Sequence, residues 1–183
     1  MRAKRWLRGE TDILLKVADV QPGDHVLDCT AGLASDAIIF ALGVGAEGSV
    51  TAIESQRMLA FITRVGLAVY KSDVPELNRA MRAVRLEHAD HLEYLKRLPD
   101  RSVDIVYLDP MFRHPIEESA AISALRGAAN NHPVREETIG EARRVGRKTI
   151  VLKEHRNSRE FVRLGFREIH KSGAKIAYGV IRL

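Results

Sequence analysis

The sequence predicts a single α/β domain built on a seven-stranded, mostly parallel sheet with one antiparallel strand in a C-terminal hairpin. Short apolar strands alternate with amphipathic helices along the 183 residues. A strand, a glycine-bearing turn and a helix follow one another at 25–42, and this unit opens nucleotide-binding sheets. Two strand-like segments joined by Ser172-Gly173-Ala174 close the chain and indicate the hairpin.

Composition sets the broad class of protein. With 45% hydrophobic residues, the chain can bury the core of one ordinary domain. The apolar runs are shorter than a membrane span and no apolar signal region follows the basic start, so we expect a cytoplasmic protein without a membrane partner. A single cysteine excludes an internal disulfide bond. The net charge of +5 favours a polyanionic partner such as RNA, although such a charge also serves solubility alone.

The chain is expected to divide into a basic N-terminal arm at 1–10 and one domain at 11–183. The arm has no helical or strand period. The basic residues around its Trp6 are Arg2, Lys4, Arg5 and Arg8. Such a segment is either an arm that contacts RNA or a solvated tail whose tryptophan packs against the domain.

The spacing of apolar residues predicts the elements in order. Helical spacing predicts helices at 11–18, 36–42, 56–70, 75–83, 92–98, 117–130, 134–145 and 161–164. Short apolar or alternating runs predict strands at 25–28, 48–54, 84–88, 103–108, 148–153, 166–170 and 175–182. Turn residues punctuate them, as Pro22-Gly23-Asp24 does before the first strand.

The turn after the first strand predicts a binding site for a ligand without phosphates. Asp28 ends the strand, where its carboxylate can accept from an amino or cationic group, and Gly32 lets the backbone approach a ligand closely. The dinucleotide fingerprint is absent because Ala34 stands where a second glycine would be expected. Ser35 or Asp36 is expected to cap the following helix.

The second and third strands also end in acidic residues. Glu54 follows Gly32 by about 20 residues, the position that grips a ribose diol in nucleotide-binding folds. Asp90 either accepts from an adenine amino group or caps the helix at 92–98. His88 and His91 lack a third partner at metal-ligand spacing, so we expect no metal site.

The fourth strand ends in Asp109 and Pro110, followed by Phe112. Proline biases the preceding residue toward an extended conformation, which holds Asp109 at the edge where open α/β sheets place their ligands. A carboxylate and a backbone carbonyl could accept the two N–H groups of an exocyclic amine while Phe112 stacks on the base. This pattern predicts methylation of such an amine; the alternative is a strand end with a helix-starting loop.

Two further readings complete the candidate site. Basic residues that follow strands at the same edge are expected to contact RNA phosphates; they are Arg113, His114, Lys153, His155 and Arg156. Cys29 is the rival nucleophile, but its sequence neighbours include no basic residue that would lower the pKa of its thiol. We therefore interpret Cys29 as an inert, buried residue.

The most specific motifs are Asp28-Cys29-Thr30-Ala31-Gly32-Leu33, Ser35-Asp36-Ala37, His88-Ala89 and Tyr107-Leu108-Asp109-Pro110-Met111-Phe112. They resemble the class I S-adenosylmethionine-dependent methyltransferases, and within them the ribosomal RNA small-subunit methyltransferase J family. The resemblance implies a Rossmann-like fold, S-adenosylmethionine as cofactor, and methylation of the exocyclic amine of a guanine in ribosomal RNA. By position it implies that the cofactor is contacted by Ser35, Asp36, Glu54, Ser55, Asp90, His91 and Asp109.

The chain departs from that family's pattern near the expected RNA surface. Ala34 and Ser35 stand where the family has Gly and Arg, Arg113 replaces a proline, and a longer N-terminal region is missing. Two other classes of function therefore stay open. One is a methyltransferase for a small molecule or protein, and the other is a non-catalytic RNA-binding relative of the fold.

Overall fold

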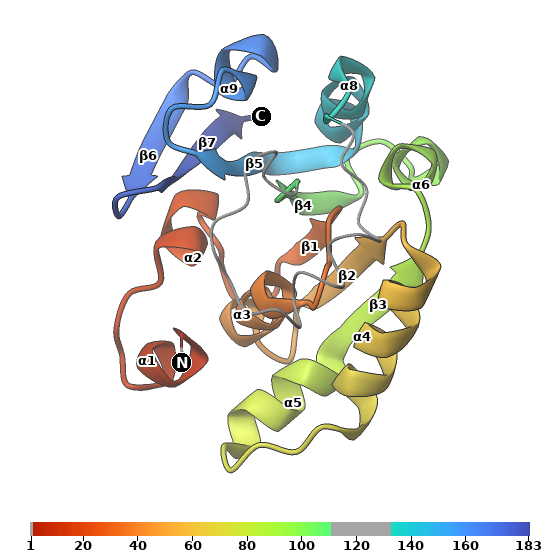
Figure 1. Cartoon of the computed structure of the whole chain (residues 1–183), viewed down its shortest axis with the longest axis vertical. Coiled ribbons are helices and arrows are strands. Elements are labelled where there is room, and N and C mark those ends of the chain that lie inside the picture. Colours follow the sequence, from red (N-terminus) through yellow and green to blue (C-terminus); the bar gives the residue numbers. More distant parts are fainter. Residues whose placement is uncertain (1, 111–132) are drawn as a thin grey trace.

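The computed structural model describes residues 2–110 and 133–183. Its seven strands form one sheet in the order β3-β2-β1-β4-β5-β7-β6 (Figure 1). They are β1 (His25–Asp28), β2 (Ser49–Glu54), β3 (Val84–His88), β4 (Val103–Leu108), β5 (Gly146–His155), β6 (Glu168–Ser172) and β7 (Ile176–Arg182). Only β7 runs against its neighbours β5 and β6, which confirms the predicted sheet with its one reversed strand.

Helices cover both faces of this sheet (Figure 1). The described helices are α1 (Arg2–Leu7), α2 (Ile13–Ala18), α3 (Ser35–Val44), α4 (Arg57–Val69), α5 (Pro75–Ala83), α6 (His91–Arg97), α8 (Glu136–Val145) and α9 (Glu160–Arg163). One apolar cluster joins the sheet to α2, α3, α4 and α5, and the other joins it to α6, α8 and α9. This is the doubly wound arrangement that βα units with right-handed crossovers produce.

Strand alternation decides which side chains meet on each face. Tyr107 belongs to the cluster under α3, whereas its neighbours Val106 and Leu108 belong to the opposite cluster. In β5, Val151 faces the α3 side and Leu152 the other. Because side chains two residues apart share a face, polar residues at the ends of β1, β4 and β5 can gather beneath α3.

Three expectations about local structure differ from the structure. The opening segment forms the short helix α1, although it has no clear apolar period. Strand β5 extends two residues beyond the predicted range at each end. Its first residue, Gly146, pairs with β4, and its last residue, His155, pairs with β7. Neither Ser35 nor Asp36 caps α3, since the N-cap is Ala34 in the left-handed conformation with no side-chain hydrogen bond.

Some expectations fall outside the described residues. These are the helix at 117–130 and the site residues Phe112, Arg113 and His114. Within the described part of the chain, no helix has the length and apolar character needed to cross a membrane.

Candidate active site

The site lies at the carboxyl ends of β1 and β4. These two strands are parallel neighbours, with Asp28 paired in register with Tyr107. From β1 the chain crosses to β2 on one side, and from β3 it returns to β4 on the other. Ligands of open α/β sheets bind at such a switch point, so Asp28, the glycine turn and Asp109 are brought together where the sequence predicted.

The glycine turn is held by side chains from β2 and α4. Gly32 adopts φ +51°, a conformation that disfavours other residues, although no heavy atom of residues 2–110 or 133–183 lies within 4 Å of an added Cβ. Glu54 Oε2 accepts from the Gly32 amide at 3.0 Å, and Oε1 accepts from the Gln56 amide at 2.8 Å. The Thr63 hydroxyl donates to the Gly32 carbonyl at 2.8 Å. Sequence spacing predicted Gly32 with Glu54, whereas Thr63 lies in an ordinary helical pattern and carries no signal.

Glu54 fits the role of a ribose acceptor. Each carboxylate oxygen has two acceptor sites, and from the described residues each accepts one backbone N–H. The Gly32 amide that it binds belongs to a residue whose Cβ position is uncrowded in the described part of the chain. A diol could therefore bind this carboxylate while the turn stays in place.

At the end of β3, Asp90 is the N-cap of α6. Its Oδ1 accepts from the amides of Leu92 and Glu93 at 2.9 and 3.1 Å, which confirms the capping alternative. His91 Nε2 lies 3.4 Å from Thr138 Oγ1, and burial lowers the pKa of its imidazole. The backbone of Ser55 approaches His88, whose Nε2 lies 3.1 Å from its carbonyl oxygen. These groups adjoin Glu54, because the Ala89 amide donates to the Glu54 carbonyl.

Thr30 joins the ends of β1 and β4. Its hydroxyl oxygen accepts from the Asp109 amide at 2.6 Å, and its own amide donates to Asp28 Oδ1 at 3.0 Å. Asp28 is only 1% exposed. Burial raises the pKa of Asp28 to about 8; Asp36 and Asp109 add to the shift, and Lys153 opposes it.

Lys153 lies between two of the acidic residues. Its ammonium nitrogen is 2.6 Å from Asp109 Oδ2 and 2.9 Å from Asp36 Oδ2. Asp36 also accepts from the Tyr107 hydroxyl at 2.7 Å and pairs with Arg2. Lys153 therefore points into the site rather than onto an open rim, a placement that its position after a buried run of β5 did not indicate.

The titration of this cluster follows from burial and from neighbouring charge. Burial raises the pKa of Asp109, Lys153 opposes the rise, and Asp36 adds to it. Burial lowers the pKa of Lys153, but Asp109 and Asp36 outweigh it and leave the pKa above its ordinary value. For Asp36, Lys153 and Arg2 outweigh the effect of burial and lower the pKa.

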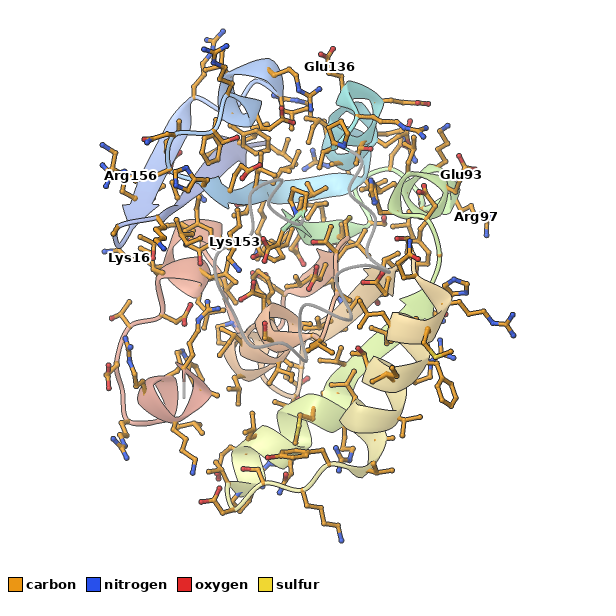
Figure 2. All side chains as sticks on the ribbon, viewed as in Figure 1. Lys16, Glu93, Arg97, Glu136, Lys153 and Arg156 are labelled. Carbon is orange, nitrogen blue, oxygen red and sulfur yellow. The ribbon has the colours of Figure 1, made fainter. Side chains whose placement is uncertain are left out.

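The remaining sequence-predicted residues lie around this centre. Ser35 is exposed at the start of α3, and His155 and Arg156 are exposed beyond Lys153. Figure 2 shows Arg156 beside the β6–β7 hairpin and Lys153 nearer the centre. Cys29 is 3% exposed, and burial raises the pKa of its thiol, as expected for an inert residue. Among residues 2–110 and 133–183, no group of three or more His, Cys, Asp or Glu side chains could hold a metal ion.

Comparison with known proteins gives the chain a family. Residues 1–132 match the family described as "Putative SAM-dependent methyltransferase". The chain is 44% identical to the uncharacterized protein YpiP of Bacillus subtilis over 181 residues, which cover 99% of this chain and 70% of that protein.

Two further likenesses are more distant. The chain is 33% identical over 108 residues to ribosomal RNA small subunit methyltransferase J of Pseudomonas syringae, covering 58% of this chain and 39% of that protein. The fold matches the crystal structure of a SAM-dependent methyltransferase from Aquifex aeolicus with a TM-score of 0.58 and 14% identity, covering 99% of both chains. The cofactor of this family is S-adenosylmethionine. The chain belongs to the S-adenosylmethionine-dependent methyltransferase family, and it resembles ribosomal RNA small-subunit methyltransferase J within it.

Proposed function

We propose that this methyltransferase transfers a methyl group to the exocyclic amine of a guanine in RNA, with small-subunit ribosomal RNA as the substrate. The observation that carries the proposal is the Asp109 carboxylate at the switch point between β1 and β4. Its Oδ2 accepts from Lys153 at 2.6 Å, and the Asp109 side chain is 25% exposed, so an amine can reach it. The name of the methyltransferase J relatives supports RNA as the substrate, although the chain spans only about 40% of their length.

The residues around Gly32 would hold the cofactor. The turn and Glu54 offer a backbone approach and a diol acceptor, and Asp90 is exposed at the end of β3 for an amino group. Ser35, Ser55 and His91 lie next to these groups in the chain and stay proposed contacts. Asp36 already accepts from Tyr107, Lys153 and Arg2, so we propose that it supports the site from beneath.

When bound, S-adenosylmethionine supplies a methyl group activated by the positive sulfonium. The exocyclic nitrogen is a weak nucleophile because its lone pair is delocalised into the ring. Asp109 Oδ1 accepts one N–H of this amine and the Pro110 carbonyl accepts the other, which favours a tetrahedral nitrogen. Holding nitrogen, methyl and sulfur in line contributes roughly 7 to 11 kcal/mol.

The proton balance of this step involves Asp109. Methyl transfer leaves a positively charged nitrogen, and Asp109 accepts one of its protons as the neutral methylamine forms. The contact of Asp109 with the amine therefore strengthens as charge develops, which makes it a transition-state contact. Stacking of the base on Phe112 stays a prediction from the sequence.

The experiment is transfer of an isotope-labelled methyl group from S-adenosylmethionine to undermethylated ribosomal RNA. We expect Asp109→Ala to slow the chemical step by a factor of tens to nearly a thousand, about 2 to 4 kcal/mol, and to change cofactor affinity much less. Asp109→Asn keeps an accepting oxygen and is expected to retain partial activity. Calorimetry with S-adenosylmethionine measures the affinity of each variant.

The matched control is Asp104→Asn, which removes a carboxylate from the opposite end of the same strand. Asp104 accepts from the His25 amide and pairs with Arg147, so its loss affects stability and not the reaction. Wild-type rates for Asp109→Ala would remove Asp109 from the mechanism. Cofactor binding without methylation of any RNA would instead favour a small-molecule or protein substrate.

A further inference from the structure

We propose that Lys153 is a positioning residue for Asp109: it holds Oδ2 of the carboxylate and so presents Oδ1 to the incoming amine, while Asp36 and Arg2 hold Lys153 in place. The statement that Oδ1 receives the amine rests on the proposed function. The contact between Lys153 and Asp109 can be tested without any substrate.

The first support is an alternating chain of charges that ends at Asp109. Its members, in order of contact, are Asp12, Arg2, Asp36, Lys153 and Asp109. Arg2 Nη2 lies 2.6 Å from Asp12, and Lys153 bridges the two remaining carboxylates. Each of the two cations touches two carboxylates, so Asp36 is joined to both Arg2 and Lys153, and Lys153 is held from the side opposite Asp109. The outer end is fixed because Asp12 is itself the N-cap of α2.

The second support is the way the fold fixes the lysine. Lys153 pairs in register with Tyr178 of β7, and Leu152 before it pairs with Leu108 of β4. Because β5 is paired on both sides here, the lysine stem starts from a rigid strand. Its side chain is 19% exposed, compared with 41% for Lys148 on the same strand.

The third support is the charge that surrounds Asp109. Four other elements direct ionisable groups at this carboxylate: Asp28 of β1, Asp36 of α3, Lys153 of β5 and Tyr178 of β7. Tyr107, two residues before it on β4, donates its hydroxyl proton to Asp36. Among the described residues, Lys153 is the cation in contact with Asp109, while Asp36 is a like charge that raises the pKa of Asp109. Without Lys153, the carboxyl would bind a proton at higher pH, and a protonated Oδ1 could no longer accept from the amine.

The experiment compares Lys153→Met and Lys153→Arg with Lys148→Met as the matched control. Lys148 pairs with Asp24 near the other end of β5 and makes no contact with the site. We expect Lys153→Met to lower the rate of methyl transfer about tenfold at pH 7. Above pH 9 the rate of the variant should lie within about threefold of the wild-type rate. The reason is that an adjacent cation lowers a carboxyl pKa by about one to three units, so Asp109 needs a higher pH to ionise without it. Lys153→Arg should restore most of the loss, and Lys148→Met should leave the pH profile unchanged.

A second measurement needs no RNA. Carbon NMR of the full chain follows the side-chain carboxyl signal of Asp109 as pH is changed. The signal is assigned by its loss in Asp109→Asn. We expect its midpoint to rise by at least one unit in Lys153→Met and to stay in place in Lys148→Met. An unchanged midpoint would overturn the positioning role whatever the enzyme methylates. A raised midpoint in a protein that methylates no RNA would leave the role standing and reject the proposed substrate.

Discussion

Asp28 is a carboxylate that the fold buries without an ion pair in the described part of the chain. Its hydrogen bonds come from Thr30, and its neighbours Asp36 and Asp109 are themselves acidic. The neutral acid is therefore the favoured form at neutral pH, and a positive charge placed beside Asp28 would favour its ionised form.

The raised pKa of Asp28 makes stability depend on pH. An acid whose folded pKa exceeds its unfolded value stabilises the protein below the unfolded pKa, near 4, and loses that contribution as pH rises toward 8. We expect Asp28→Asn, which keeps an oxygen for the Thr30 amide, to gain roughly 2 to 4 kcal/mol relative to wild type between pH 5 and pH 8. Urea unfolding at the two pH values measures this difference. An equal difference at both values would contradict a neutral Asp28.

Single residues show where sequence reasoning stops. Asp28, Gly32, Glu54 and Asp109 could be predicted because each ends a strand or opens a turn, and parallel strands end at one edge. Thr30 and Thr63 could not, since a hydroxyl that bridges two backbones has no spacing signature. For Lys153, the strand end could be predicted, but the contacts of its ammonium group with two acidic residues from other elements could not.

At the scale of elements, α1 is tied to the domain by its first residue. Arg2 pairs with Asp12 at the start of α2 and with Asp36 at the start of α3, and both carboxylates are nearly buried. Lys4 adds a pair with Asp73 from the loop before α5. We propose that the first turn of the basic arm has a structural role, because Arg2 joins the starts of α2 and α3. We call its ion pairs with Asp12 and Asp36 the clasp.

This clasp predicts a pH-dependent cost for removing Arg2. We expect Arg2→Met to lower the free energy of unfolding by about 1 to 3 kcal/mol at pH 7, because Asp12 and Asp36 lose a charged donor. The pKa of Asp36 is lowered in the fold, so this contribution is present above pH 4 and is lost as pH falls. Urea unfolding at pH 7 and pH 3 measures it. Arg8→Met, at an exposed arginine just beyond α1, should change little; equal losses for the two variants would reject the clasp.

Most elements could be predicted from local pattern alone. The limits of β1, β3 and α5 agree with the predicted ranges, with turn residues before β1 and a proline at the start of α5. The length of β5 depends on pairing with β7, which is a long-range property, and the cap of α3 depends on an unusual conformation of Ala34. Helix α1 forms where tertiary ion pairs stabilise a segment that has little apolar period of its own.

At the scale of the whole molecule, the charged residues that sum to a net charge of +5 are not evenly distributed around the site. The centre is acidic, and the exposed Arg156 lies on the hairpin side of the same edge (Figure 2), where its amide donates to the carbonyl of the exposed Lys175. A polyanion would therefore be attracted to the edge and repelled from the centre, which leaves the cofactor turn and Asp109 accessible to a single base.

The salt dependence of RNA affinity tests this arrangement. If Arg156 contacts one phosphate, Arg156→Glu should weaken binding and reduce the log-log salt slope by about 0.7, the value for single strands. Arg97→Glu is the matched charge reversal, because Arg97 ends α6 on the other side of the molecule (Figure 2). Filter binding over a range of salt concentrations gives both slopes. Equal effects of the two substitutions would indicate attraction by net charge alone.

The alternating contacts from Asp12 to Asp109 also constrain which amino-acid substitutions can accumulate in related proteins. A neutral residue at position 153 would leave Asp36 and Asp109 without the cation that they share, and a neutral residue at position 36 would remove the carboxylate that joins Arg2 to Lys153. Either change alone is unfavourable, whereas a paired change keeps the balance. Among proteins that share one ancestor, substitutions at positions 2, 36 and 153 should therefore occur together. A substitution in the first turn of the chain then alters the charge balance at the reacting edge of the sheet.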